Sequence, residues 1–195
     1  MKFSSPILLA SASPRRKSLL SELGLKFEIK TKDIDESFPA DLTREQAAIF
    51  IASKKAAAYE EEINAGYIVI TADTIVCLDD YILGKPTDPA DAKRMLRLLS
   101  GKKHDVITAV CIKSKESNDC FHVTTSVHFK ELSDDEIIYY IEKDKPFDKA
   151  GAYGIQDWLG LTAIDRIEGS YYNVVGLPVS ELYHHLIRLK SFSEL

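Results

Sequence analysis

The chain has 195 residues, a formal net charge of −5 and a charged fraction of 28%, which is ordinary for a globular protein of one domain or two small lobes. This acidic balance argues against a general nucleic-acid coat protein, which is normally basic, although it is compatible with a local basic pocket. The sequence has no run of eighteen apolar residues, so no membrane-spanning helix is expected.

The cysteine pattern bears on the cellular compartment. Cys77, Cys111 and Cys120 lie far apart in the sequence. An odd number without CxxC spacing predicts reduced, buried thiols and disfavours a disulfide framework or a zinc site. The chain also enters its first predicted strand without a signal-peptide pattern. We therefore expect a cytoplasmic protein.

The first predicted element is a strand that leads through a tight turn into a helix. Residues 7–10 are apolar and favour a short buried strand. Ser13 is a good N-cap for the following helix, Pro14 suits its first position, and Gly24 is placed to end it.

The first turn of this helix carries Arg15 and Arg16, where acidic residues are usual. A helix N-terminus already favours anions, so two guanidiniums there lower helix stability unless an anion lies between them. One interpretation is a phosphate site made by Ser11, Ser13 and the two arginines, because arginine makes bidentate contacts with phosphate. The alternative is an ordinary basic turn whose arginines pair with surface carboxylates.

A second strand and an acidic loop come next. Residues 25–31 alternate between apolar and polar side chains and predict a strand. Residues 33–36 then place three carboxylates, the last of them Glu36, in a loop. On its own, such a segment is typical of a solvated acidic turn.

A lysine-bearing helix follows the acidic loop. Thr43 and Gln46 form a capping box that starts a helix running to about Glu62. Lys54 and Lys55 lie in its middle. One of them could face an anion site, and solvated lysines are the ordinary alternative.

The strongest catalytic or metal-binding candidate is Asp73. Residues 67–72 are apolar and β-branched, which predicts a strand buried on both faces. Asp73 and Thr74 come at its carboxyl end. A carboxylate there is costly unless it pairs with a cation or a metal, and ligands of open α/β sheets bind beyond the carboxyl ends of the strands. A structural turn aspartate is the alternative.

The rest of the chain continues to mix strands and helices. We expect a hairpin at 75–83, a helix from Asp88 to Gly101, strands at 105–113 and 121–129, a helix at 133–142 that begins at a Ser133–Glu136 capping box, a strand at 161–167 and a last helix from Pro178. The tail from Phe192 is expected to be frayed.

Two short segments of this half carry candidate functional groups. Pro86 holds Lys85 in extended geometry. The glycine-rich residues 150–156 end on Gln156, whose amide could read a base edge or could be a solvated side chain. His104, His122 and His128 lack ligand spacing and are treated as non-ligands.

Six sequence blocks in this order resemble the Maf family of nucleotide pyrophosphatases over nearly the whole chain. The blocks are LASASPRR (9–16), TADTIV (71–76), LGKP (83–86), LSGKKHDVITAV (99–110), DKAGAYGIQ (148–156) and GSYYNVVGLP (169–178). The absence of GxxxxGK[ST] excludes a P-loop NTPase.

The resemblance implies an α/β fold, with a mixed, elongated sheet flanked by helices and two lobes around a cleft, as in inosine triphosphate pyrophosphatases. It implies a single Maf-like domain over 1–195 that hydrolyses a nucleoside triphosphate to the monophosphate and pyrophosphate. It also implies a divalent cation, Mg²⁺ or Mn²⁺, and often a homodimer. No nucleic-acid or membrane partner is expected.

The resemblance also assigns roles to particular residues. Asp73 looks like the general base or metal-ordering carboxylate, with Glu36 as its metal partner. The phosphate-site residues it implies are Ser11, Arg15, Arg16, Lys55 and Lys85. The motif does not fix whether Lys54 or Lys55 faces the site, and we expect Lys55.

Substrate preference is implied by a smaller set of residues. Arg15, Thr74 and Gln156 look like the set that separates subfamilies, and AGAYGIQ resembles the branch acting on dTTP and UTP. Two other hypotheses remain open: a house-cleaning hydrolase of modified nucleotides, and a nucleotide-sensing regulator of cell division.

Overall fold

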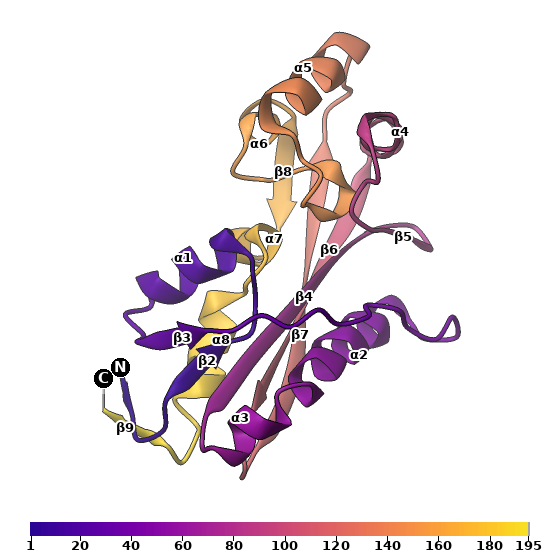
Figure 1. Ribbon diagram of the computed structural model, residues 1–195. Coiled ribbons are helices and arrows are strands. Elements are labelled where there is room, and N and C mark those ends of the chain that lie inside the picture. Colours follow the sequence, from indigo (N-terminus) through magenta and orange to yellow (C-terminus); the bar gives the residue numbers. More distant parts are fainter. Residues whose placement is uncertain (195) are drawn as a thin grey trace. The chain divides into compact units, whose positions relative to one another are not determined.

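A computed structural model describes residues 1–194 (Figure 1). Its strands are β1 (Lys2–Phe3), β2 (Ile7–Leu9), β3 (Phe27–Ile29), β4 (Ile68–Leu78), β5 (Tyr81–Leu83), β6 (Lys103–Lys113), β7 (Asn118–Phe129), β8 (Ile164–Glu168) and β9 (Phe192–Glu194). Its helices are α1 (Pro14–Glu22), α2 (Arg44–Ala57), α3 (Glu60–Asn64), α4 (Pro89–Leu99), α5 (Asp134–Asp144), the 3₁₀ turn η1 (Ala150–Ala152), α6 (Trp158–Thr162), α7 (Tyr171–Val175) and α8 (Val179–Leu186).

The main sheet is mixed, so the predicted fold class is confirmed. Its strands follow the order β3-β2-β4-β6-β7-β8, and β5 pairs with β4. β2 runs parallel to both β3 and β4, whereas β5 is antiparallel to β4 and β8 is antiparallel to β7. Every residue of β4 except Thr74 is buried, as the apolar run predicts.

The chain divides into two compact units, which we describe separately. Unit 1 contains 1–73, 108–123 and the segment from Gly176 onward, and unit 2 contains 74–107 and 124–175. One of the division points therefore lies inside β4, between Asp73 and Thr74. The single domain and the cleft implied by the resemblance stay predictions.

In unit 1, α2 lies over β4. The helix begins at the predicted capping box, in which Thr43 and Gln46 satisfy each other's backbone N–H groups. Its buried face consists of Ala47, Ala48, Ile51, Ala52 and Ala56. The Thr71 hydroxyl donates to the Ala52 carbonyl at 2.7 Å, which fixes the helix against the strand. The alanines of this face allow the helix to approach the sheet closely.

Unit 2 has its own apolar core. α4 packs against α5 (Figure 1), and the core side chains that they contribute are Ala92, Met95, Leu96, Leu99, Ile137, Tyr140 and Ile141. Asp88 caps α4, and the predicted Ser133–Glu136 capping box starts α5. Local capping and apolar spacing thus agree with the observed packing.

The prediction of three reduced thiols is wrong for two of the cysteines. Cys111 and Cys120 form a disulfide, whereas Cys77 is a buried thiol. The paired cysteines lie on β6 and β7, which a short connection joins as a hairpin. Cysteine spacing alone could not show this pairing, because it depends on the register of the hairpin.

Three predicted elements also differ from the structure. The strand expected to end before Asp73 continues to Leu78 as β4, so Asp73 lies inside the strand and not at its carboxyl end. The helix expected to reach Glu62 breaks at Tyr59, and α3 follows separately. The tail expected to be frayed forms β9 as far as Glu194 and pairs with β1.

Within the described residues, no helix combines the length and the apolar character needed to cross a membrane.

Candidate active site

The turn between β2 and α1 is held by serine hydroxyls. The backbone N–H of Ser13 donates to the Ser11 hydroxyl at 3.2 Å, and Ser13 accepts from the N–H of Arg16 as the predicted N-cap. Pro14 occupies the first helical position, and Leu19 and Leu20 bury the far side of the helix. The turn therefore presents Arg15 and Arg16 at a defined place.

The Arg16 guanidinium donates hydrogen bonds to two backbone carbonyls of unit 1. Its Nε donates to the Gly176 carbonyl and its Nη1 to the Ala72 carbonyl, both at 2.8 Å. Burial lowers the pKa of Arg16, and the negative charge of Asp73 opposes this shift. Arg16 thus fixes the residue before Asp73. Its predicted contact with phosphate stays a prediction.

Lys55 brings together the two carboxylates that the sequence singled out. Its Nζ lies 2.7 Å from Asp73 Oδ1 and 2.7 Å from Glu36 Oε1. The Lys55 and Asp73 side chains are only 14% and 11% exposed, so their charges are weakly screened. The cluster comes from three segments of unit 1: the acidic loop, α2 and the end of its part of β4.

Lys54 faces a different partner. Its Nζ lies 2.9 Å from Asp35 Oδ2 and donates to the Ser37 carbonyl at 3.2 Å. The Ser37 hydroxyl and Lys54 hold the pKa of Asp35 well below its usual range. Consecutive helical residues point about 100° apart, so only Lys55 of this pair reaches Asp73.

The donor set of this cluster fits a divalent cation. Glu36 and Asp73 converge on one point, which the Lys55 ammonium occupies. Groups of three or more histidine, cysteine or carboxylate ligands are absent from the described residues. Mg²⁺ does not need such a cage, because one or two carboxylates with phosphate oxygens and water suffice.

In unit 2, a backbone hydrogen bond joins the segment that carries Lys85 to the segment that carries Gln156. The Gly151 N–H donates to the Gly84 carbonyl at 3.0 Å. Gly151 has φ +67°, and a Cβ there would lie 3.0 Å from the Val76 side chain, so any other residue would be strained there. Lys85 and Gln156 are both exposed. Thr74 is half-buried in β4, directly after Asp73.

Sequence reasoning missed two residues that support the glycine-rich segment. His104 Nε2 lies 2.7 Å from the Tyr153 hydroxyl, and His104 is only 2% exposed. Burial keeps the pKa of the Tyr153 phenol above its usual range, so its hydroxyl stays protonated. Both residues lie inside blocks that carried the family resemblance, and that was the only available signal. His104 therefore has a structural role in unit 2.

The buried imidazole predicts loss of stability in mild acid. Burial lowers the pKa of His104 from 6.5 to about 4. Between these values the unfolded chain binds more protons than the folded chain, so the free energy of unfolding falls as pH falls. Urea titrations should show this free energy dropping by about 2 kcal/mol more between pH 7 and pH 5 in the wild type than in His104→Gln. Equal drops in both proteins would contradict this assignment.

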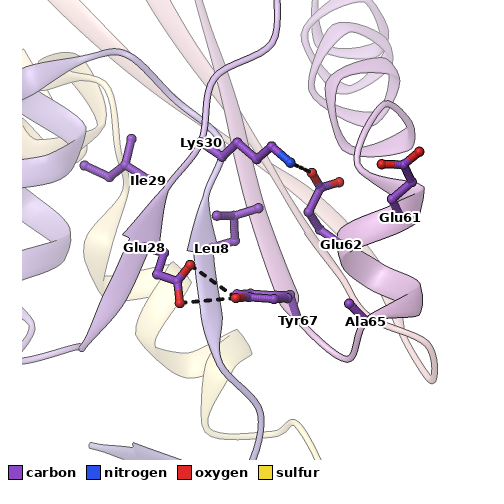
Figure 2. Close-up of a pocket in the computed structure, with 8 residues that line it drawn as sticks. All are labelled: Leu8, Glu28, Ile29, Lys30, Glu61, Glu62, Ala65 and Tyr67. Carbon is purple, nitrogen blue, oxygen red and sulfur yellow. Dashed lines mark hydrogen bonds and ion pairs between the residues drawn. The ribbon is translucent and has the colours of Figure 1, made fainter.

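Unit 1 also contains a separate hollow. It has a volume of about 370 Å³ and is lined by Leu8, Glu28, Ile29, Lys30, Glu61, Glu62, Ala65 and Tyr67. Figure 2 shows that Lys30 points to Glu62 and the Tyr67 hydroxyl points to Glu28. None of the predicted site residues lines it, so the Lys55 cluster is the better candidate for the chemistry.

Comparison with known proteins gives matches along nearly the whole chain. Residues 6–189 match the family model described as Maf-like protein. A dTTP/UTP pyrophosphatase from Phocaeicola vulgatus is 52% identical over 184 residues, which cover 94% of this chain and 95% of that protein. A protein of the same name from Porphyromonas gingivalis is 50% identical over 191 residues, with 96% and 94% covered.

A solved structure also aligns with the chain. The crystal structure of a nucleoside-triphosphatase, dITP/XTP pyrophosphatase, from Mycobacterium abscessus is 13% identical and has a TM-score of 0.48, covering 96% of this chain and 100% of that one. The range that matches the family model includes every predicted site residue.

Proposed function

Because this chain belongs to the Maf family, we propose that it hydrolyses dTTP and UTP to the nucleoside monophosphate and pyrophosphate. The names of the Phocaeicola and Porphyromonas relatives support the substrates. The observation that carries the chemistry is the cluster in which Lys55 contacts both Asp73 and Glu36 at 2.7 Å. A site that only sensed phosphate would not need two carboxylates there.

Hydrolysis at the α-phosphorus requires an oriented water and neutralised charge, with little covalent chemistry. A water oxygen forms a bond to the α-phosphorus while the bond to the bridging oxygen breaks, and pyrophosphate leaves with that oxygen. Asp73 is the carboxylate that takes the proton from the attacking water. Asp73 lies inside the buried strand β4, and the hydrogen bond from Arg16 to the neighbouring Ala72 carbonyl helps to keep it rigid.

The cationic groups balance the charge of the triphosphate. Lys55, Arg15 and Lys85 would contact phosphate oxygens, together with the Ser11 hydroxyl and the N–H groups at the start of α1. A divalent cation held by Glu36 and Asp73 would add charge neutralisation when bound. Lys55 neutralises the same carboxylates in the structure, which keeps them in place.

The test is pyrophosphate release from a panel of nucleoside triphosphates with Mg²⁺ and then Mn²⁺. The panel contains dTTP, UTP, CTP, GTP, 7-methyl-GTP and modified pyrimidines. We expect kcat/KM for dTTP and UTP to exceed the values for CTP and GTP by about tenfold or more, the effect of one well-placed hydrogen bond.

Other outcomes would contradict the proposal in distinct ways. A preference for 7-methyl-GTP would overturn the substrate assignment and keep the reaction. Nucleotide binding without turnover would instead support the sensor hypothesis, and a preference for modified pyrimidines would support the house-cleaning hypothesis. The homodimer and the cytoplasmic location stay predictions from the sequence.

A further inference from the structure

The side-chain amide of Gln156 is tied to the next residue in the chain. Gln156 Nε2 donates to Asp157 Oδ1 at 2.9 Å. Gln156 is exposed, and this is the one side-chain hydrogen bond that it makes among the described residues. Its Oε1 therefore remains available as an acceptor.

Asp157 is itself held firmly by unit 2. Its Oδ2 accepts from the Tyr140 hydroxyl at 3.1 Å and lies 3.4 Å from Lys149 Nζ. The Tyr140 oxygen also accepts from the Gly154 N–H at 3.0 Å. Burial keeps the pKa of the Tyr140 phenol above its usual range, so the hydroxyl keeps the proton that it donates.

Asp157 occupies the N-cap position of α6 without capping it. An aspartate there usually accepts from the backbone N–H groups of the first turn, yet its side chain makes no such bond. Both oxygens are engaged by Gln156, Tyr140 and Lys149 instead. Gly154 makes room for this arrangement, because a Cβ there would overlap both Asp157 Oδ2 and Gln156 Nε2.

The carboxylate removes the usual ambiguity of a glutamine side chain. A free amide can rotate to exchange its oxygen and its NH₂ group, so it can serve a donor or an acceptor equally. A carboxylate only accepts, so the NH₂ group must face Asp157. The rotated amide would place Oε1 against Oδ1, where two acceptors repel each other.

This arrangement matches one kind of pyrimidine edge. Uracil and thymine carry an N3–H donor beside the O4 acceptor, whereas cytosine carries the N3 acceptor beside an N4 amino group. A fixed Gln156 offers Oε1 to the N3–H and its second N–H to O4. Pairing with cytosine would require the rotated amide.

We propose that Asp157 is a positioning residue for base selection, which locks the Gln156 amide to accept the N3–H of uracil or thymine and to reject cytosine. This inference rests on the proposed function, since it assumes that Gln156 contacts the base. It adds Asp157, together with Tyr140 and Lys149 behind it, to the groups that set substrate preference.

The test compares UTP with CTP in wild type, Asp157→Asn, Gln156→Ala and the double variant. An asparagine at 157 can rotate to accept or donate, so either Gln156 rotamer becomes tolerable. We expect the UTP to CTP ratio of kcat/KM to fall about tenfold in Asp157→Asn, partly through a gain in CTP turnover. In the Gln156→Ala background, Asp157→Asn should leave the ratio unchanged, because the effect passes through Gln156.

Asp148→Asn is the matched control. Asp148 lies 2.9 Å from the same Lys149 Nζ, but the carboxylate that accepts from the Gln156 amide is Asp157, so we expect the ratio to stay at the wild-type value. If Asp157→Asn lowers UTP and CTP turnover equally, or shifts the ratio equally in both Gln156 backgrounds, Asp157 is only structural and the proposal is wrong.

Binding of UMP and CMP, measured by calorimetry, separates this inference from the proposed activity. A wild-type chain that releases no pyrophosphate would refute the activity. If that chain still binds UMP about tenfold more tightly than CMP, and Asp157→Asn removes the difference, the positioning role stands. If the wild type binds both equally, the proposal fails whatever the activity.

Discussion

Replacing Asp73 with asparagine is expected to lower kcat for UTP by about a thousandfold or more while the chain stays folded. General-base catalysis contributes roughly 10² to 10⁴ in rate, and a cation site would be weakened by the same change. The measurement is steady-state pyrophosphate release, with circular dichroism to verify the fold.

The fold should survive because the change leaves an ion pair in place. An asparagine oxygen can still accept from Lys55, and Lys55 keeps its contact with Glu36 at 2.7 Å. Neither the lysine nor the glutamate is left buried without a partner, which is the situation that usually destabilises a protein strongly. A loss of activity in a folded variant therefore reports on chemistry.

Asp35→Asn is the matched control for Asp73→Asn. Asp35 lies 2.9 Å from Lys54, the neighbour of Lys55 on α2, but its side chain is 70% exposed. Exposed ion pairs contribute little to stability, so this variant should keep kcat within about twofold of the wild type. Near-wild-type turnover by Asp73→Asn would remove Asp73 from the mechanism.

The parts of the fold that were predictable have strong local causes. Capping boxes at Thr43 and Ser133 started helices as expected, and the apolar run before Asp73 became a buried strand. The segment at 161–167 was harder: the sequence predicted one strand, and the structure has the end of α6 before β8. Short helices such as α6 and α7 carry too few turns for apolar spacing to identify them.

The sequence motifs were enough to predict which residues belong to the candidate site, but only some of the contacts between their side chains. The motif did not fix whether Lys54 or Lys55, the residue we expected, faces the site, because this depends on how α2 is rotated against β4. Likewise, Asp157 was absent from the predicted site, since its partner Tyr140 lies on another helix. Resemblance supplies residue types, and packing decides which atoms meet.

The contacts of Arg16 differ most from what the sequence suggested, and they lead to a second prediction with a large expected effect. The sequence suggests that Arg16 contacts phosphate, whereas in the structure its Nε and Nη1 donate to the carbonyls of Gly176 and Ala72. Those carbonyls belong to residues 160 and 56 positions away in the chain. Lysine keeps the charge of Arg16 but cannot present two donors in a rigid fork.

Arg16→Lys should therefore damage both stability and turnover. One buried carbonyl would lose its donor, at a cost of about 1–3 kcal/mol in the free energy of unfolding. Asp73 would also lose part of its support through Ala72, and small displacements of a catalytic group can lower kcat about a hundredfold. Urea titration measures the first effect, and steady-state kinetics with UTP measures the second.

The balance between kcat and KM identifies what Arg16 does. If Arg16 only attracts phosphate, Arg16→Lys should raise KM and leave the free energy of unfolding near the wild-type value. If Arg16 supports Asp73, Arg16→Lys should lower both kcat and the free energy of unfolding. Lys17→Gln is the control, because it removes a charge from the exposed side of the same helical turn. It should change kcat by less than about twofold and the free energy of unfolding by less than about 0.5 kcal/mol.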